Sequence, residues 1–221
     1  MRDAISNLCK EITSQVLPLM VPTANNLARM EPSMDCFRLN PNSTEPHMLE
    51  KFTFLGYFLG WSLRARGSLA IDLPISYWKR ILHGNKDYVF SIQDLREMDV
   101  FRAEMLNQIR QHAIELDSDE VFSVFYDGYY FTASLGTENE EENIVELCEG
   151  GSSKPLTREN AEEYISLYLQ KYTEQDAVQF ERLWLAIQDC ASETMLSHIS
   201  PQIAANRASS KPFITTAAMK A

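Results

Sequence analysis

The chain has 221 residues, of which 45% are hydrophobic and 23% are charged, and its formal net charge is −11. This length is enough for one large domain or two small ones with a full core, and the apolar fraction excludes a wholly disordered chain. The acidic excess disfavours nucleic acid as a partner, because an acidic surface repels phosphate groups.

The sequence contains no pattern typical of a secreted or membrane protein. Charged and apolar side chains alternate in the first ten residues, unlike the apolar core of a signal peptide. The longest apolar-rich run, 52–63, is too short to span a bilayer. Four scattered cysteines without a C-x-x-C pair favour reduced thiols over a disulfide framework or zinc site. We therefore expect a cytoplasmic protein that binds no membrane, metal or cofactor.

The N-terminal part of the chain is predicted to combine one helix with short extended segments. Apolar residues recur at helical spacing over 4–16, and the pattern ends before Pro18. An extended segment is expected at 17–21. Repeated prolines over 22–46 predict loops around one short strand at 36–39.

Two helices are predicted in the next part. The first, 48–66, is the most apolar segment of the chain, and we expect it to be central. Gly56 and Gly60 are four residues apart within it, a spacing that lets a neighbouring helix approach closely. The second helix follows Pro74 and ends at Gly84, in agreement with the preferences of proline and glycine for helix ends.

The second half begins with helices and continues with strands. Ser91 begins a short capped helix, and apolar residues every four positions predict a longer helix from Phe101 to Leu116. Aromatic and β-branched residues over 121–126 and 129–135 flank Asp127-Gly128, which predicts a β-hairpin. A third strand is expected at 144–147.

The remaining segment is again helical. Thr157 is predicted to cap a helix over 158–172, and Thr173 to begin another that carries Phe180 and Trp184. The order of helices, a small antiparallel sheet and further helices indicates the α+β fold class, with a larger helical subdomain and a smaller one that contains the sheet.

The negative charge is concentrated in the middle of the chain. Between Gln111 and Ser153 there are eleven acidic residues and no Lys or Arg: Glu115, Asp117, Asp119, Glu120, Asp127, Glu138, Glu140, Glu141, Glu142, Glu146 and Glu149. Such a region attracts a basic protein surface, although charge runs equally serve to solvate loops.

The patterns that usually accompany catalysis are absent from the sequence. It contains no G-x-S-x-G, no H-E-x-x-H and no His/Cys cluster with metal-ligand spacing. Gly150-Gly151 lacks the further glycines of a phosphate-binding loop and indicates a turn. We expect no catalytic residue, no metal ligand and no cofactor-binding residue in this chain.

One segment points to a family. Residues 144–168 read I-V-E-L-C-E-G-G-S-S-K-P-L-T-R-E-N-A-E-E-Y-I-S-L-Y, and the four-residue spacing places Tyr164 and Tyr168 on one helix face. Further blocks precede it in order: R-D-A-I-S-N-L-C-K-E-I, D-C-F-R-L-N-P-N-S, F-T-F-L-G-Y-F-L-G-W and Q-D-L-R-E-M-D-V. Together they resemble the HECT domain of HECT-type ubiquitin ligases, in particular that of the large HERC-type proteins.

The resemblance implies the N-terminal lobe of a HECT domain over 1–204, followed by a disordered tail over 205–221. A smaller subdomain, at about 85–172, would then dock a ubiquitin-conjugating enzyme that carries ubiquitin. By position, the docking groove is expected to contain Met105, Leu106, Ile109, Tyr164 and Tyr168. The alternative for each of these side chains is a place in the core.

The chain also departs from the family pattern. The cysteine that accepts ubiquitin belongs to a C-terminal lobe, and none of Cys9, Cys36, Cys148 and Cys190 matches it. After about Pro201 the sequence no longer follows the family. The chain is therefore expected to be inactive alone, and Ala221 can be an artificial end, the end of an incomplete gene prediction or the end of a natural short form. Three functions remain open: the docking lobe of a ubiquitin ligase, a non-catalytic fragment that sequesters conjugating enzymes, or an acidic helical scaffold unrelated to ubiquitin.

Overall fold

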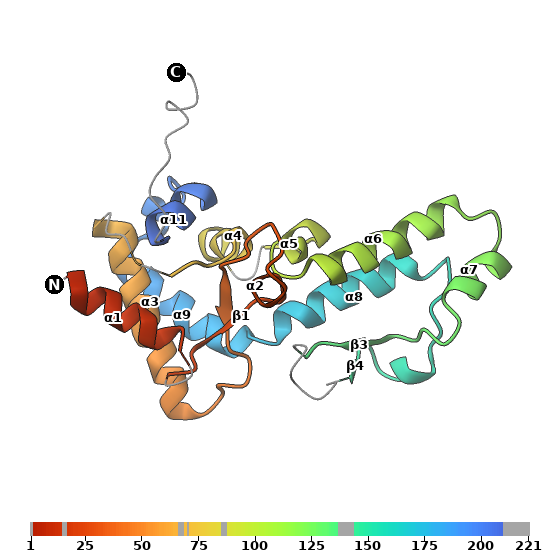
Figure 1. The fold of residues 1–221 in the computed structure, drawn as a ribbon, viewed down its shortest axis with the longest axis horizontal. Coiled ribbons are helices and arrows are strands. Elements are labelled where there is room, and N and C mark those ends of the chain that lie inside the picture. The colour runs from red at the N-terminus through yellow and green to blue at the C-terminus, as the bar shows by residue number, and fades with distance from the viewer. Residues whose placement is uncertain are drawn as a thin grey trace, which may run out of the picture. The chain divides into compact units, whose positions relative to one another are not determined.

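The computed structural model describes residues 2–14, 17–65, 69, 71–84, 88–136 and 144–209 (Figure 1). The chain divides into two compact units. A larger unit comprises 1–89 and 176–221, and a smaller unit comprises 90–175. The smaller unit is therefore inserted between two segments that fold together. The sequence analysis placed the smaller subdomain at about 85–172.

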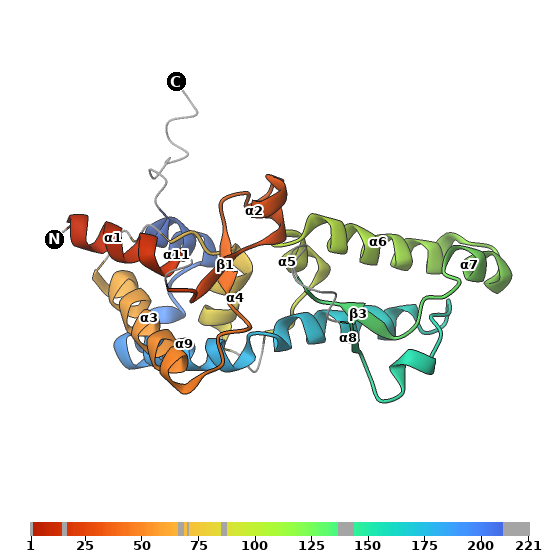
Figure 2. The same ribbon diagram turned by 60° about the horizontal axis from the view of Figure 1, so that its bottom comes forward.

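The larger unit is organised around one pair of helices. Helix α3 (Pro46–Ala65) runs alongside α9 (Ala177–Cys190), as both views show (Figures 1 and 2). A Cβ atom added at Gly56 would lie 2.3 Å from the carbonyl oxygen of Leu183, and one added at Gly60 would lie 2.7 Å from the Cβ of Cys190. The two glycines therefore let the helices approach closely, which confirms the prediction made from their spacing.

Short elements surround this pair. They are α1 (Arg2–Ile12), β1 (Met20–Pro22), α2 (Ala24–Ala28) and β2 (Phe37–Leu39). Strands β1 and β2 pair antiparallel, with Met20 opposite Leu39. Helix α2 was not predicted; Thr23 caps it by accepting a hydrogen bond from the backbone N–H of Asn26. The helix lies in the range 22–46, where the prolines had suggested loops and one strand.

The remaining helices of the larger unit are α4 (Ile75–His83), α10 (Glu193–Leu196) and α11 (Pro201–Ala208). Helix α11 packs against α4 and α3. Ser200 caps α11 and Pro201 occupies its first turn, so the chain stays helical to Ala208, where the sequence analysis expected a tail from 205. The rest of that expected tail, 210–221, lies outside the described residues.

The smaller unit consists of α5 (Ile92–Arg96), α6 (Val100–Glu115), α7 (Asp119–Phe125), β3 (Thr132–Ser134), β4 (Ile144–Glu146), a 3-10 turn η1 (Gly151–Ser153) and α8 (Ala161–Glu174). Ser91 and Asp94 form a reciprocal capping box on α5, as its sequence predicted. Helices α6 and α8 lie side by side in both views (Figures 1 and 2). Strands β3 and β4 pair antiparallel, with Thr132 opposite Glu146.

The predicted β-hairpin around Asp127-Gly128 is wrong. Residues 119–125 form helix α7, because Ser118 caps it and Asp119 and Glu120 place negative charge at its N-terminus. Burial of Phe122 against the unit outweighs the β propensity of the surrounding residues. Gly128, with φ of 79°, still makes a turn, but the turn connects a helix to β3.

The predicted N-cap of α8, Thr157, is also wrong, because the N-cap is Asn160, three residues later. Helix α8 begins at Ala161 after Asn160. The Asn160 side chain closes the preceding turn: its Oδ1 accepts from the Thr157 backbone N–H at 2.7 Å, and its Nδ2 donates to the Pro155 carbonyl at 3.0 Å. Thr173, expected to begin the next helix, lies within the last turn of α8.

The helices and the two small antiparallel sheets confirm the α+β fold class. None of the helices in the described ranges combines the length and the apolar character that a membrane span requires.

Candidate partner-docking site

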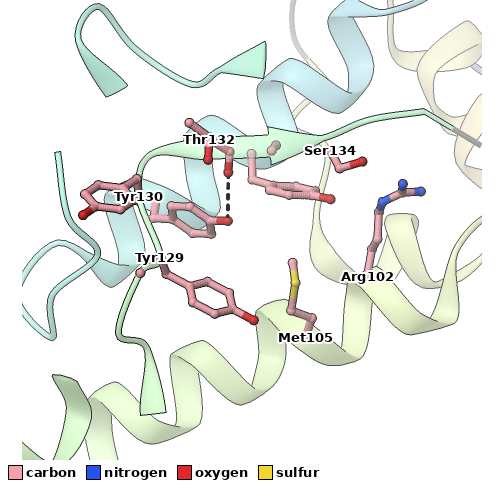
Figure 3. A pocket seen from close by; sticks show the side chains of 10 residues that line it. Arg102, Met105, Tyr129, Tyr130, Thr132 and Ser134 are labelled. Carbon is pink, nitrogen blue, oxygen red and sulfur yellow. Dashed lines mark hydrogen bonds between the residues drawn. The ribbon is translucent and has the colours of Figure 1, made fainter. Parts of the chain in front are cut away.

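A pocket of about 310 Å³ opens on the smaller unit between α6, the segment around β3, and α8. This volume is at the lower end of the range for small-molecule sites and is large enough for a partner's side chain. Figure 3 shows Arg102 and Met105 rising from α6 toward the strand that carries Thr132 and Ser134. The lining residues are Arg102, Met105, Gly128, Tyr129, Tyr130, Thr132, Ala133, Ser134, Tyr164 and Tyr168.

Arg102 is fixed at the first turn of α6. Asp99 caps the helix through its Oδ1, which accepts the Arg102 backbone N–H at 2.9 Å. The Asp99 Oδ2 pairs with the Arg102 guanidinium at 2.5 Å, and Nη2 of Arg102 donates to the Gly136 carbonyl at 2.7 Å. Burial lowers the pKa of Arg102, but the Asp99 charge and hydrogen bond together with Tyr168 and Tyr172 raise it above its ordinary value. The guanidinium is therefore a rigid, charged part of the pocket wall.

The two tyrosines of α8 form the opposite wall, and both are almost fully buried. Their rings lie 6.1 Å apart, and the Tyr164 ring contacts Phe131 edge-on at 5.5 Å. The Tyr164 hydroxyl donates to the Thr132 carbonyl at 3.3 Å, the dashed line in Figure 3. Burial raises the pKa of Tyr164 to about 12 and the pKa of Tyr168 further still, so both hydroxyls stay protonated at neutral pH.

The structure divides the three predicted α6 residues between the pocket and the core. Met105 is half-buried and lines the pocket. Leu106 and Ile109 are 0% exposed and do not line it, so their predicted place in an accessible groove is wrong. The physical reason is the helical repeat: the buried side of α6 follows Ala103, Leu106 and Ile109 at three-residue steps, and the assignment by position could not tell this side from the pocket side.

Sequence reasoning missed the side of the pocket that comes from residues 128–134. Tyr129 and Tyr130 are 43% and 42% exposed and line the pocket, yet the sequence assigned them only to a strand. The Tyr129 ring contacts Tyr126 edge-on at 5.5 Å, which anchors it to the end of α7. Two adjacent aromatic residues directly after an Asp-Gly turn were the available indication that side chains there reach solvent.

Acidic and apolar side chains are exposed on the same unit as the pocket. Seven of the eleven acids of the acidic stretch are exposed: Glu115, Asp117, Asp119, Glu120, Asp127, Glu146 and Glu149. The other four, Glu138 and 140–142, lie outside the described residues. Phe101, one turn before Met105, is 58% exposed, and Phe125 on α7 is 57% exposed. Exposed aromatic residues within an acidic surface are suited to a protein partner that has apolar and basic side chains.

The described residues contain no group of three or more His, Cys, Asp or Glu side chains arranged to hold a metal ion. None of the four cysteines forms a disulfide; Cys9 is buried and the other three are partly accessible. The pocket itself is lined by hydroxyl, thioether and guanidinium groups, without a nucleophile paired to a base. The arrangement is therefore suited to binding.

The fold is that of an α+β protein with an open, partly aromatic pocket on its smaller unit, and comparison with known sequences gives the family. Residues 6–221 match the HECT-domain (ubiquitin-transferase) family, and the chain belongs to it. The match continues past Pro201, so the expectation that the resemblance ends there is wrong. The ligase resemblance drawn from the sequence blocks is confirmed.

Two curated relatives carry the name E3 ubiquitin-protein ligase HERC2. The protein from Mus musculus is 28% identical over 122 residues, and the one from Homo sapiens is 27% identical over 122 residues. Each alignment covers 55% of this chain, and the chain spans 2% of the length of each relative.

Proposed function

We propose that the smaller unit docks a ubiquitin-conjugating enzyme, charged with ubiquitin, as one step of a HECT-type ubiquitin ligase. The observation that carries the proposal is the pocket between α6, β3 and α8, whose walls are aromatic and open. Membership of the ubiquitin-transferase family supplies the class of partner. In the complete ligase, ubiquitin would pass from the conjugating enzyme to a ligase cysteine and then to a substrate lysine.

The residues of the pocket have the properties of a binding hot spot. Tyrosines provide large contact areas with few rotatable bonds, and here two of them are locked by burial while Tyr129 and Tyr130 stay accessible. Met105 adds a flexible apolar side chain that adapts to an incoming group. A partner side chain that enters the pocket would thus gain contact with several rings at once.

The negative charge of the smaller unit supports the same class of partner. The exposed acids of the smaller unit would steer a basic partner surface toward it and would increase the association rate at low salt. Acids that merely solvate the surface would leave the association rate unchanged when the salt concentration is raised.

Isothermal titration calorimetry of the 221-residue chain against a panel of ubiquitin-conjugating enzymes tests the proposal. Tyr129→Ala and Met105→Ala should each weaken binding about tenfold or more, because both remove accessible pocket contacts. Leu185→Ala is the matched control: Leu185 on α9 is 48% exposed, close to the 43% of Tyr129, and belongs to the larger unit. Absence of binding across the panel, or equal losses for Leu185→Ala, would contradict the proposal.

A second assay separates docking from transfer. The chain is incubated with activating enzyme, a conjugating enzyme and ubiquitin, and run on a non-reducing gel. Docking alone gives binding without a ubiquitin adduct on this chain, and added chain should inhibit an intact ligase by competing for the conjugating enzyme. A thiol-sensitive adduct would instead assign a transfer step to one of its four cysteines.

A further inference from the structure

A row of aromatic side chains is exposed on helix α3 of the larger unit. Phe54, Tyr57 and Trp61 are 53%, 44% and 45% exposed. Their spacing, three residues and then four, places them along one side of the helix. Exposed apolar side chains that form a continuous row mark a surface for association with another protein.

The rings of this row are held in place by contacts within the larger unit. Phe58 lies between Phe54 and Trp61, with its ring nearly parallel to both at centroid distances of 6.3 Å and 6.4 Å. The Tyr57 hydroxyl donates to the Asp189 carboxylate of α9 at 3.1 Å. Side chains that are ordered in advance lose little conformational freedom on binding, so these rings are suited to anchor an interface.

The row is flanked by opposite charges. Glu50 lies one turn before the first ring and Arg64 lies one turn after the last, and both side chains are exposed. Steps of four and three residues alternate along the complete row, as they do in the seam between two paired helices. The five positions are Glu50, Phe54, Tyr57, Trp61 and Arg64, with Tyr57 at the midpoint.

This row is complementary to itself when two copies of the helix pair antiparallel. Such a pair places Glu50 of each copy beside Arg64 of the other, with a twofold axis near Tyr57. A parallel pair would place Glu50 beside Glu50 and Arg64 beside Arg64, and the like charges would repel each other. The two charges therefore favour a second copy in the antiparallel orientation.

The charge of the larger unit is compatible with self-association. Its two segments, 1–89 and 176–221, contain 14 Lys and Arg residues against 12 Asp and Glu, whereas 90–175 contains 6 against 19. Association of two copies through the strongly acidic smaller unit would be opposed by like charge. Association through the nearly neutral larger unit carries no such penalty.

We propose that α3 mediates an antiparallel dimer of this chain, in which the aromatic rows of two copies pack together and Glu50–Arg64 ion pairs form at both ends. A fully buried aromatic side chain contributes about 150–250 Å², so the three half-exposed rings offer roughly 300 Å² in each copy. A standard interface buries about 800 Å² of each partner, so the dimer is weak and reversible. It uses the larger unit only and does not depend on the proposed docking function.

Sedimentation equilibrium of the 221-residue chain at low salt, from about 5 to 500 μM, tests for the dimer. We expect the mean mass to rise from one chain to two, with a dissociation constant on the order of 10–100 μM. Phe54→Ala and Trp61→Ala should each weaken association about tenfold or more. Ile203→Ala is the matched control and should leave association unchanged, because Ile203 is 40% exposed on α11 of the same unit.

Two charge reversals test the antiparallel orientation. Glu50→Arg and Arg64→Glu should each weaken self-association about fivefold, because each brings like charges together at both ends of the dimer. An equimolar mixture of the two variants should associate at least as tightly as the unaltered chain, because unlike charges then meet at both ends. In a parallel dimer the single reversals would leave the repulsion as it was. Far-UV circular dichroism checks that each variant is folded.

Three results would overturn the inference. A chain that remains a monomer at about 500 μM would assign the aromatic row to a different protein. A loss in Ile203→Ala equal to that in Trp61→Ala would show that the row is not the contact surface. Single charge reversals that self-associate as tightly as the unaltered chain would exclude the antiparallel pair.

Discussion

Gly56 on α3 faces the backbone of Leu183 on α9 so closely that a Cβ atom at Gly56 would lie 2.3 Å from the Leu183 carbonyl oxygen. The contact joins two helices separated by more than a hundred residues of chain, because the smaller unit is inserted between them. The stability of the larger unit thus depends on a position that accepts no side chain.

Gly56→Ala should destabilise the larger unit by about 1–3 kcal/mol, because the added methyl group forces the two backbones apart. All three tryptophans, Trp61, Trp78 and Trp184, belong to the larger unit, so their fluorescence in urea reports its unfolding. Glu50→Ala, at an exposed position of α3, is the control and should change stability by less than about 0.5 kcal/mol. Equal midpoints for the two variants would show that the helices adjust freely.

Asp176→Asn should destabilise the larger unit by about 3 kcal/mol. The Asp176 carboxylate accepts from Arg80 at 2.8 Å and also from the Tyr77 hydroxyl, and the Arg80 and Asp176 side chains are 10% and 4% exposed. The amide would remove the carboxylate charge that pairs with the buried Arg80 guanidinium. Lys171→Met breaks the exposed pair with Glu174 and should change stability by less than about 1 kcal/mol. Tryptophan fluorescence for the first variant and circular dichroism for the second would measure these effects.

Met105 and Leu106 are adjacent in sequence and should respond differently to truncation. Leu106→Ala creates a cavity in the core of the smaller unit and should lower its stability by about 2–5 kcal/mol. Met105→Ala removes a half-buried side chain from the pocket and should cost less than about 1.5 kcal/mol while it weakens partner binding. Hydrogen exchange of α6 and α8 amides measures the stability of this unit. Similar amide exchange rates in both variants would contradict the assignment of Leu106 to the core and Met105 to the pocket.

The smaller unit should lose stability as the pH rises from 10 to 12. Tyr164 has a pKa of about 12 in the folded chain and about 10 when unfolded, so its contribution is complete below pH 10 and is lost as the pH rises through the folded pKa. The loss from Tyr164 should reach about 2 kcal/mol at pH 12. Urea denaturation followed by circular dichroism should show this slope, and Tyr164→Phe should reduce it. A slope unaffected by Tyr164→Phe would place the cause in other groups.

Much of the fold was predictable because local chemistry and tertiary packing agree there. Gly56 and Gly60 predicted the close helix pair, and Ser91 with Asp94 predicted the cap of α5. The segment 119–125 was not predictable from propensity, since its valines and phenylalanines favour strands while the burial of Phe122 requires a helix. Only a tertiary contact resolves such a conflict.

The sequence by itself determined the α+β class, the ubiquitin-ligase family and the placement of Tyr164 and Tyr168 on one face of α8, because periodicity, capping residues and residue order are local properties. Only the tertiary structure decided that Met105 faces the pocket while Leu106 and Ile109 fill the core, and that Tyr129 and Tyr130 line a further side of the pocket. Apolar residues lie all round α6, so the choice of the buried side depends on where α8 packs, and that position is set by contacts between residues more than fifty positions apart.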